Sequence, residues 1–107
     1  MKASWILAIF GIVAIITIIS IAGNVNAKTV YVGPLERYTS IQDAIDNATD
    51  GDTIIVKDGV YYENINVTKR LIIKSQNGPD NCTIDGKGKT VVTLNADGIT
   101  IEGFTIR

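Results

Sequence analysis

From residue 52 onward the chain is a succession of short apolar runs separated by turn-forming residues, and this pattern constrains the fold most. Each run is rich in Ile, Val and Thr, while Gly, Asn and Asp fill the intervals. Several runs alternate, as in Ile99-Thr100-Ile101-Glu102, so one face of each is expected to be buried and the other wet. We therefore predict an all-β fold. The runs are residues 52–57, 63–67, 71–75, 82–86, 91–94, 99–103 and 104–107.

The runs also recur, which favours a repeat over a sandwich. Taken in threes, they bring similar apolar residues into correspondence at intervals of about 27–30 residues. Such a recurrence predicts a parallel solenoid of two to three coils, in which each strand pairs with the equivalent strand of the next coil. The expected correspondences are Ile54 with Ile84, Ile65 with Val92, Ile73 with Ile101, and Ile84 with Ile106.

One short helix is predicted before the strands, at about residues 40–49. Ile41, Ala44, Ile45 and Ala48 fall on one helical face, and Ser40 is a suitable N-cap residue. A helix of this length is not stable alone, so its apolar stripe must cover something. We expect it to cap the first layer of the solenoid.

Residues 1–27 are predicted to be an export segment. Lys2 precedes an uncharged apolar run over residues 5–22, and Val25 and Ala27 fit the −3 and −1 positions of a signal-peptidase site. Lys28 would then be the first mature residue. The alternative is an uncleaved anchor that holds residues 28–107 at the membrane, because the run would form about 27 Å of helix, close to the thickness of the bilayer core. Both alternatives predict an extracytoplasmic protein, secreted or anchored at the cell surface.

Residues 38–107 resemble the opening of the pectin-lyase-like right-handed parallel β-helix proteins, and within them the NosD-like and cell-surface branch. The motifs that carry the resemblance are S-I-Q-x-A-I, A-T-D-G-D-T-I-x-V, G-V-Y-Y-E-N-I-N-V, K-R-L-I-I-K-S, T-I-D-G and I-T-I-E-G-F-T-I. The resemblance implies a single-stranded right-handed parallel β-helix behind the signal or anchor helix. Family members usually continue for many more coils, so we expect a truncated member or a unit that stacks end to end on another chain.

The resemblance is more specific for fold than for function, because the superfamily includes enzymes, adhesins and assembly proteins. Our first hypothesis is a non-catalytic cell-surface or envelope protein that serves a structural role or contacts glycans. The alternatives are the N-terminal part of a polysaccharide lyase or hydrolase, and a NosD-like accessory protein of copper-site assembly. The chain has no His, one Cys and one Met, which leaves few metal ligands, and we predict neither cofactor nor metal.

The net charge of −1 gives no electrostatic footprint for nucleic acid. The expected partner is a polysaccharide or an envelope glycan. Candidate contact residues are two adjacent tyrosines, of which one should be buried and one exposed because neighbours on a strand face opposite sides, together with two lysines of a loose basic set. They are Tyr61, Tyr62, Lys87 and Lys89.

Three glycosylation sequons also suit an exported chain, at Asn47, Asn66 and Asn81. The remaining chemical groups have structural interpretations. Asp85-Gly86 and Asp97-Gly98 are expected to form turns, and no catalytic residue is predicted. Cys82 has the same parity as Ile84 and should point inward as a small apolar residue.

Overall fold

The computed structural model describes residues 27–107, which form nine short strands and one helix. The export segment predicted over residues 1–27 lies outside this range except for Ala27. Among residues 27–107, no helix has both the length and the apolar character needed to cross a membrane. The elements are β1 (Thr29–Val32), α2 (Ile41–Asn47), β2 (Thr53–Val56), β3 (Gly59–Tyr62), β4 (Ile65–Val67), β5 (Ile72–Ser75), β6 (Cys82–Asp85), β7 (Val92–Leu94), β8 (Thr100–Glu102) and β9 (Thr105–Ile106).

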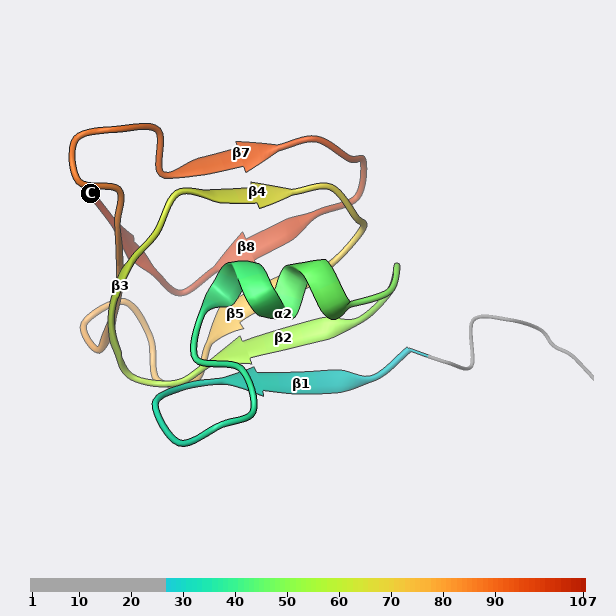
Figure 1. Cartoon of the computed structure of the whole chain (residues 1–107), viewed down its shortest axis with the longest axis horizontal. Coiled ribbons are helices and arrows are strands. Elements are labelled where there is room, and N and C mark those ends of the chain that lie inside the picture. The colour runs from blue at the N-terminus through green and yellow to red at the C-terminus, as the bar shows by residue number, and fades with distance from the viewer. Residues whose placement is uncertain (1–26) are drawn as a thin grey trace, which may run out of the picture.

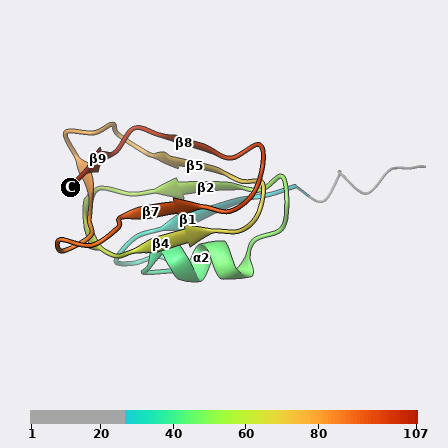
Figure 2. The same cartoon turned by 90° about the horizontal axis from the view of Figure 1, so that it is seen from above.

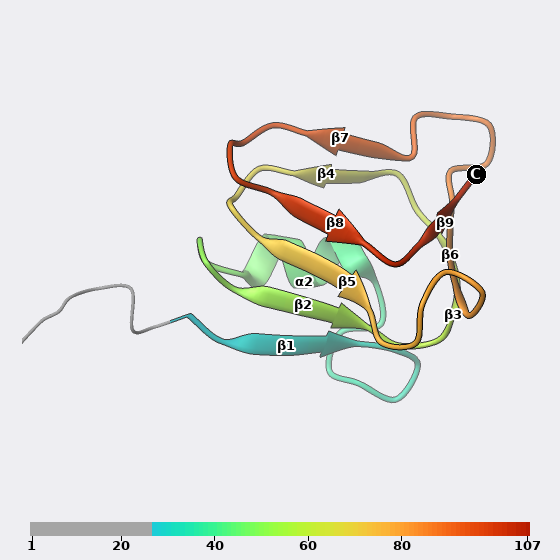
Figure 3. The same ribbon diagram turned by 180° about the vertical axis from the view of Figure 1, so that it is seen from behind.

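The strands form three parallel sheets, with orders β1-β2-β5-β8, β3-β6-β9 and β4-β7 (Figure 1). The chain visits the sheets in turn, from β2 through β3 to β4 and then back to β5 beside β2. Figure 3 shows the four-stranded sheet from behind, with β1, β2, β5 and β8 side by side. Paired residues lie between 19 and 28 positions apart in the chain, as in Thr53 with Ile72 and Ile72 with Thr100.

The strand pairing confirms three of the four expected correspondences. Ile65 pairs with Val92, Ile73 with Ile101, and Ile84 with Ile106.

The correspondence of Ile54 with Ile84 is wrong, because Ile54 pairs with Ile73 and Ile84 pairs with Tyr61. The error has one cause. Asp58-Gly59 has the composition of a turn, but Gly59 begins β3, a strand absent from the predicted set, and this strand shifts the division into coils.

The core is a column of aliphatic side chains enclosed by the three sheets and the helix. Alternation along β2 buries Ile54 and Val56 completely while leaving Thr53 and Ile55 partly exposed. Burying one such aliphatic side chain contributes roughly 1.5–3 kcal/mol. The same alternation buries Ile65 and Val67 on β4 and Cys82 and Ile84 on β6. These stacked inward residues therefore stabilise the fold by burying apolar surface.

Helix α2 lies beside β4 and packs against β1, β2 and β4 (Figure 2). Its bounds, Ile41–Asn47, fall within the expected residues 40–49, and Ser40 is the N-cap, accepting a hydrogen bond from the Asp43 N–H at 3.1 Å. Ile41, Ala44 and Ile45 are buried. The helix thus covers the core next to β1, β2 and β4, as the amphipathic pattern predicts.

Two charged side chains that flank β4 hold the ends of α2. The Glu63 carboxylate accepts hydrogen bonds from the N–H groups of Ile41 and Gln42, at 2.8 and 3.0 Å. At the other end, the Lys69 ammonium group donates to three carbonyl oxygens in the last turn and the C-cap, at 2.8 to 3.0 Å. An anion at the helix N-terminus and a cation at its C-terminus both complement the helix dipole. We name Glu63 and Lys69 the helix clamp.

A glutamine side chain completes the contact between the helix and the strand. The Gln42 side-chain oxygen accepts from the Asn66 N–H at 2.8 Å, and its amide nitrogen donates to the Asn66 carbonyl oxygen at 3.2 Å. The amide of Gln42 therefore occupies the place that a neighbouring strand's peptide group would take. It satisfies an edge that would otherwise be open.

The far end of the stack is more exposed. Within residues 27–107, β7, β8 and β9 each pair with a single strand. Leu94 and Ile106 are 56% and 49% exposed, and Ile101 and Phe104 are only partly buried.

The stacked interior predicts a contrast between two adjacent residues on β5. Ile73 is fully buried and Ile72 is 40% exposed. Ile73→Ala should lower the free energy of unfolding by about 2–5 kcal/mol, and Ile72→Ala by less than about 1 kcal/mol. Urea unfolding of both variants checks this. Similar losses for the two substitutions would contradict the assigned alternation.

The helix clamp predicts a second contrast. Glu63→Gln keeps the side-chain shape but removes the charge that accepts two helix N–H groups, and should cost about 1–2 kcal/mol of unfolding free energy. Glu102→Gln, on the exposed side of β8, is the matched control and should cost less than about 0.5 kcal/mol. If urea unfolding finds equal losses of unfolding free energy for the two variants, the charge of Glu63 does not stabilise the helix.

Candidate functional site

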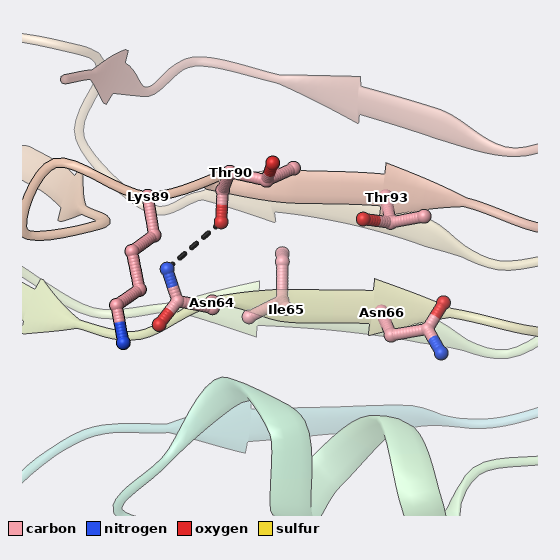
Figure 4. A pocket seen from close by; sticks show the side chains of 6 residues that line it. All are labelled: Asn64, Ile65, Asn66, Lys89, Thr90 and Thr93. Atoms are coloured by element: carbon pink, nitrogen blue, oxygen red, sulfur yellow. Dashed lines mark hydrogen bonds between the residues drawn. The ribbon is translucent and has the colours of Figure 1, made fainter.

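A hollow of about 380 Å³ lies on the outer side of β4 and β7, and we call this surface the polar face. Figure 4 shows its lining side chains, which come from β4, from β7 and from the residues that lead into each of these strands. Asn66 points outward because Ile65 and Val67, the residues before and after it in β4, face the core. Thr93 pairs with Asn66 and points the same way. The lining residues are Asn64, Ile65, Asn66, Lys89, Thr90 and Thr93.

Asn64 holds one end of the polar face in shape. Its side-chain amide nitrogen donates to the carbonyl oxygens of Gly86 and Thr90, at 3.0 and 2.8 Å, and the second bond is drawn in Figure 4. A Cβ atom at Gly86 would lie 2.7 Å from both the Lys89 carbonyl oxygen and a Val91 methyl group, so this corner requires glycine. Asn64 therefore fixes the segment 86–90 against the start of β4.

At the other end of the polar face, two asparagines from successive turns of the chain are joined. The Asn95 amide nitrogen donates to the Asn66 side-chain oxygen at 2.6 Å. Among residues 27–107, the side-chain amide nitrogen of Asn66 donates no hydrogen bond, while its oxygen accepts this one. The polar face thus presents amide and hydroxyl groups, which are the groups that pair with sugar hydroxyls.

Three of the four candidate glycan-contact residues lie around the segment 86–90. Tyr62 is 59% exposed, and the Lys87 ammonium nitrogen lies 4.2 Å from the centre of its ring, a cation–π contact. Lys89 lines the hollow. Tyr61 lies elsewhere: it is 8% exposed, and its hydroxyl donates to the Lys57 carbonyl oxygen at 2.7 Å. One tyrosine of the pair is therefore in the core and the other on the surface, as the alternation predicts.

Lys87 owes its position to Asp85, which supports the turn expected at Asp85-Gly86. Lys87 adopts a left-handed backbone conformation with φ of 55°, and its N–H donates to the Asp85 carboxylate at 2.8 Å. This N–H and the Arg107 side chain, 3.1 Å from the same carboxylate, lower the pKa of Asp85 below its ordinary value. The carboxylate is thus bound in a turn and an ion pair.

The three sequon asparagines are all exposed, but their side chains differ in their contacts. The amide nitrogen of Asn47 donates to the Asp43 carbonyl oxygen at 2.8 Å, and that of Asn81 donates to the Asn77 carbonyl oxygen at 3.2 Å. Asn66 differs because, within the part of the chain that the structure describes, its side chain takes part only as an acceptor.

Asp52 is the one buried charged side chain among the residues described. Burial alone would raise the pKa of Asp52, but hydrogen bonds from the Lys28 side chain and from the N–H groups of Thr49 and Lys28 outweigh it and lower the pKa. Its charge therefore stabilises the fold at neutral pH, and this contribution is lost as the pH falls through the lowered value.

Cys82 points inward beside Ile84, as its parity predicts, and is 1% exposed. Burial raises the pKa of its thiol to about 11, with a smaller contribution from Asp58. The thiol is therefore protonated at neutral pH. In the part of the chain described by the structure, no three His, Cys, Asp or Glu side chains gather in a way that could hold a metal ion.

A second hollow of about 370 Å³, which no sequence pattern predicted, lies along β1. Tyr31 and Tyr38 line it, and the Arg37 guanidinium lies 5.4 Å from the centre of the Tyr38 ring. The outward parity of Tyr31 in β1 is the only sequence signal for it. The role of Asn64 was not predicted either, because its side chain binds carbonyl groups more than 20 positions away in the sequence.

No family model matches the chain, and no solved structure matches it. A curated protein that it resembles is a cell surface glycoprotein of Methanothermus fervidus. The two are 39% identical over 94 residues, which cover 86% of this chain and 15% of the relative. The chain thus spans about 15% of the length of the curated protein it matches.

Proposed function

We propose that the chain is an exported cell-surface segment with a structural, non-catalytic role. The observation that carries this proposal is its 39% identity, over most of its length, to a protein described as a cell surface glycoprotein. The sequence supports it further through the uncharged run over residues 5–22 and the three exposed sequons.

We also propose that residues 28–107 form a right-handed parallel β-helix of the pectin-lyase-like kind. Three parallel sheets visited in turn, with Ile54, Ile73 and Ile101 in one row of paired residues, support this assignment. Right-handed connections dominate between parallel strands of one sheet, which favours that hand. A stack of this kind is a rigid, extended unit suited to a surface layer.

Four acidic side chains among the residues described support a structural role. Asp52 binds the start of β1, Glu63 binds the helix N-terminus, and Asp85 binds a turn and Arg107. Glu36 forms an ion pair with Lys57 at 2.9 Å. Each of these carboxylates is engaged in holding the fold.

Labelling of intact cells tests the location. A membrane-impermeant amine reagent applied to cells that produce the full chain should modify its lysines, or the chain should be found in the medium, while a cytoplasmic protein in the same cells stays unlabelled. Labelling only after the cells are broken would overturn the surface proposal.

The same preparation tests glycosylation, for which we favour Asn66 because its amide nitrogen is free to be modified. Asn66→Gln should lower the mass of the chain by one glycan, whereas Asn95→Gln, outside any sequon, should leave the glycan mass unchanged. Unmodified peptides at Asn47, Asn66 and Asn81 would overturn glycosylation and leave the location unaffected.

A second proposal is that the polar face contacts an acidic glycan. The hollow, its asparagine and threonine groups, Lys89 and the exposed Tyr62–Lys87 pair support it. Amide groups can bind sugar hydroxyls, and the lysines can bind carboxylates.

Binding of polygalacturonate, measured by calorimetry, tests this second proposal. Lys89→Met should weaken binding about fivefold, equivalent to roughly 1 kcal/mol. The matched control is Lys74→Met, on β5 in another sheet, which should leave the affinity unchanged. Absence of binding by the unmodified chain, or equal losses for both variants, would overturn the glycan contact.

A further inference from the structure

The fully buried Asp52 carboxylate is directed at a backbone nitrogen. One carboxylate oxygen accepts from the Lys28 backbone N–H at 2.9 Å. The other accepts from the Lys28 ammonium group at 2.9 Å and from the Thr49 N–H at 2.8 Å. A charge buried to this extent is costly unless its partners are strong, and only one of these three donors is charged in the uncut chain.

The nitrogen of Lys28 is held at this position by the sheet. The Thr53 N–H donates to the Lys28 carbonyl oxygen at 2.9 Å, and Thr29, the next residue, pairs with Thr53 in the β1–β2 ladder. Both backbone groups of Lys28 are therefore held: its N–H by Asp52 and its carbonyl oxygen by Thr53. The peptide bond on its N-terminal side joins it to Ala27, the residue at the −1 position of the predicted signal-peptidase site.

We propose that Asp52 is a preformed receptor for the new N-terminus that signal-peptidase cleavage creates at Lys28. This inference rests on the proposed export of the chain. Cleavage hydrolyses the Ala27–Lys28 amide bond: water supplies the hydroxyl of the Ala27 carboxylic acid and a proton to the Lys28 nitrogen. At neutral pH the carboxylic acid then loses its proton to become a carboxylate, and the free amine gains one to become an ammonium group. The neutral N–H donor at 2.9 Å from Asp52 thereby becomes an ammonium group.

Cleavage would strengthen the site without moving any residue. A charge-assisted hydrogen bond is roughly twice as strong as a neutral one, and here it would form with a carboxylate that is shielded from water. The surrounding charges are the Lys28 side chain, which already shares the carboxylate, and the exposed Asp50, whose carboxylate accepts from the Arg70 N–H at 2.9 Å on the adjacent turn. Removal of the leader would thus strengthen the attachment of β1 to β2 through Lys28 and Asp52.

Two measurements on the chain produced by an exporting host test the proposal. Peptide mapping by mass spectrometry should find Lys28 at the N-terminus. Carbamylation by cyanate at pH 7 should then be at least about tenfold slower at the Lys28 α-amine in the folded protein than in the urea-unfolded protein, because the ion pair keeps the amine protonated.

Asp52→Asn, which removes the charge and keeps the shape, should restore fast carbamylation of the α-amine. Asp80→Asn, at an exposed turn residue, is the matched control and should leave it slow. If Asp52→Asn fails to fold, the folded-to-unfolded rate ratio in the unmodified chain still decides the matter. A retained leader, an N-terminus at another residue, or an α-amine that reacts equally fast in both states would overturn the proposal, whereas the surface location is decided separately by labelling of intact cells.

Discussion

Every strand pairing in the described residues is parallel, so each strand must draw its hydrogen bonds from a strand some 19 to 28 residues away rather than from its neighbour in sequence. Parallel pairing cannot be closed by a tight hairpin. The chain therefore has to travel through the other sheets before it returns, and side chains of like character, such as Ile73 and Ile101, come to lie next to each other. Layered stacking of aliphatic side chains is the constraint from which the sheet order, the enclosed core and the exposed outer faces follow.

A stack of this kind has two ends, and several charged or polar side chains bind backbone groups at the N-terminal one. Glu63 and Lys69 bind the two ends of α2, while Gln42 satisfies the edge of β4 that no strand covers. Asp52 binds the start of β1. These side chains do not form an acid–base pair, since each is bound to backbone groups at a different point of the same end. The chemistry of this end is that of a cap, which agrees with the structural role proposed for the chain.

The sequence predicted most of this architecture, because alternation and turn residues act locally. The pattern Ile99-Thr100-Ile101-Glu102 was sufficient to assign a strand and its inward face. Gly59 was not assigned to a strand because Asp-Gly is a turn pair by composition, and the strand exists only because Cys82 lies beside it in the next coil. The residues around the polar face were predicted only in part, because some of their contacts form between residues far apart in the sequence. Exposed lysines and one outward tyrosine follow from sequence, but Asn64 acts on the carbonyl groups of Gly86 and Thr90, which only the fold brings near.

Methyl-based nuclear Overhauser measurements on the isotopically labelled chain can show whether equivalent side chains lie above one another in successive turns of the chain. We expect cross-peaks between Ile65 and Val92 and between Ile73 and Ile101, because each pair lies side by side in parallel strands. Strong contacts between backbone α-protons of strands that follow each other in sequence, such as Thr53–Val56 and Gly59–Tyr62, would indicate antiparallel hairpins and would contradict the stack.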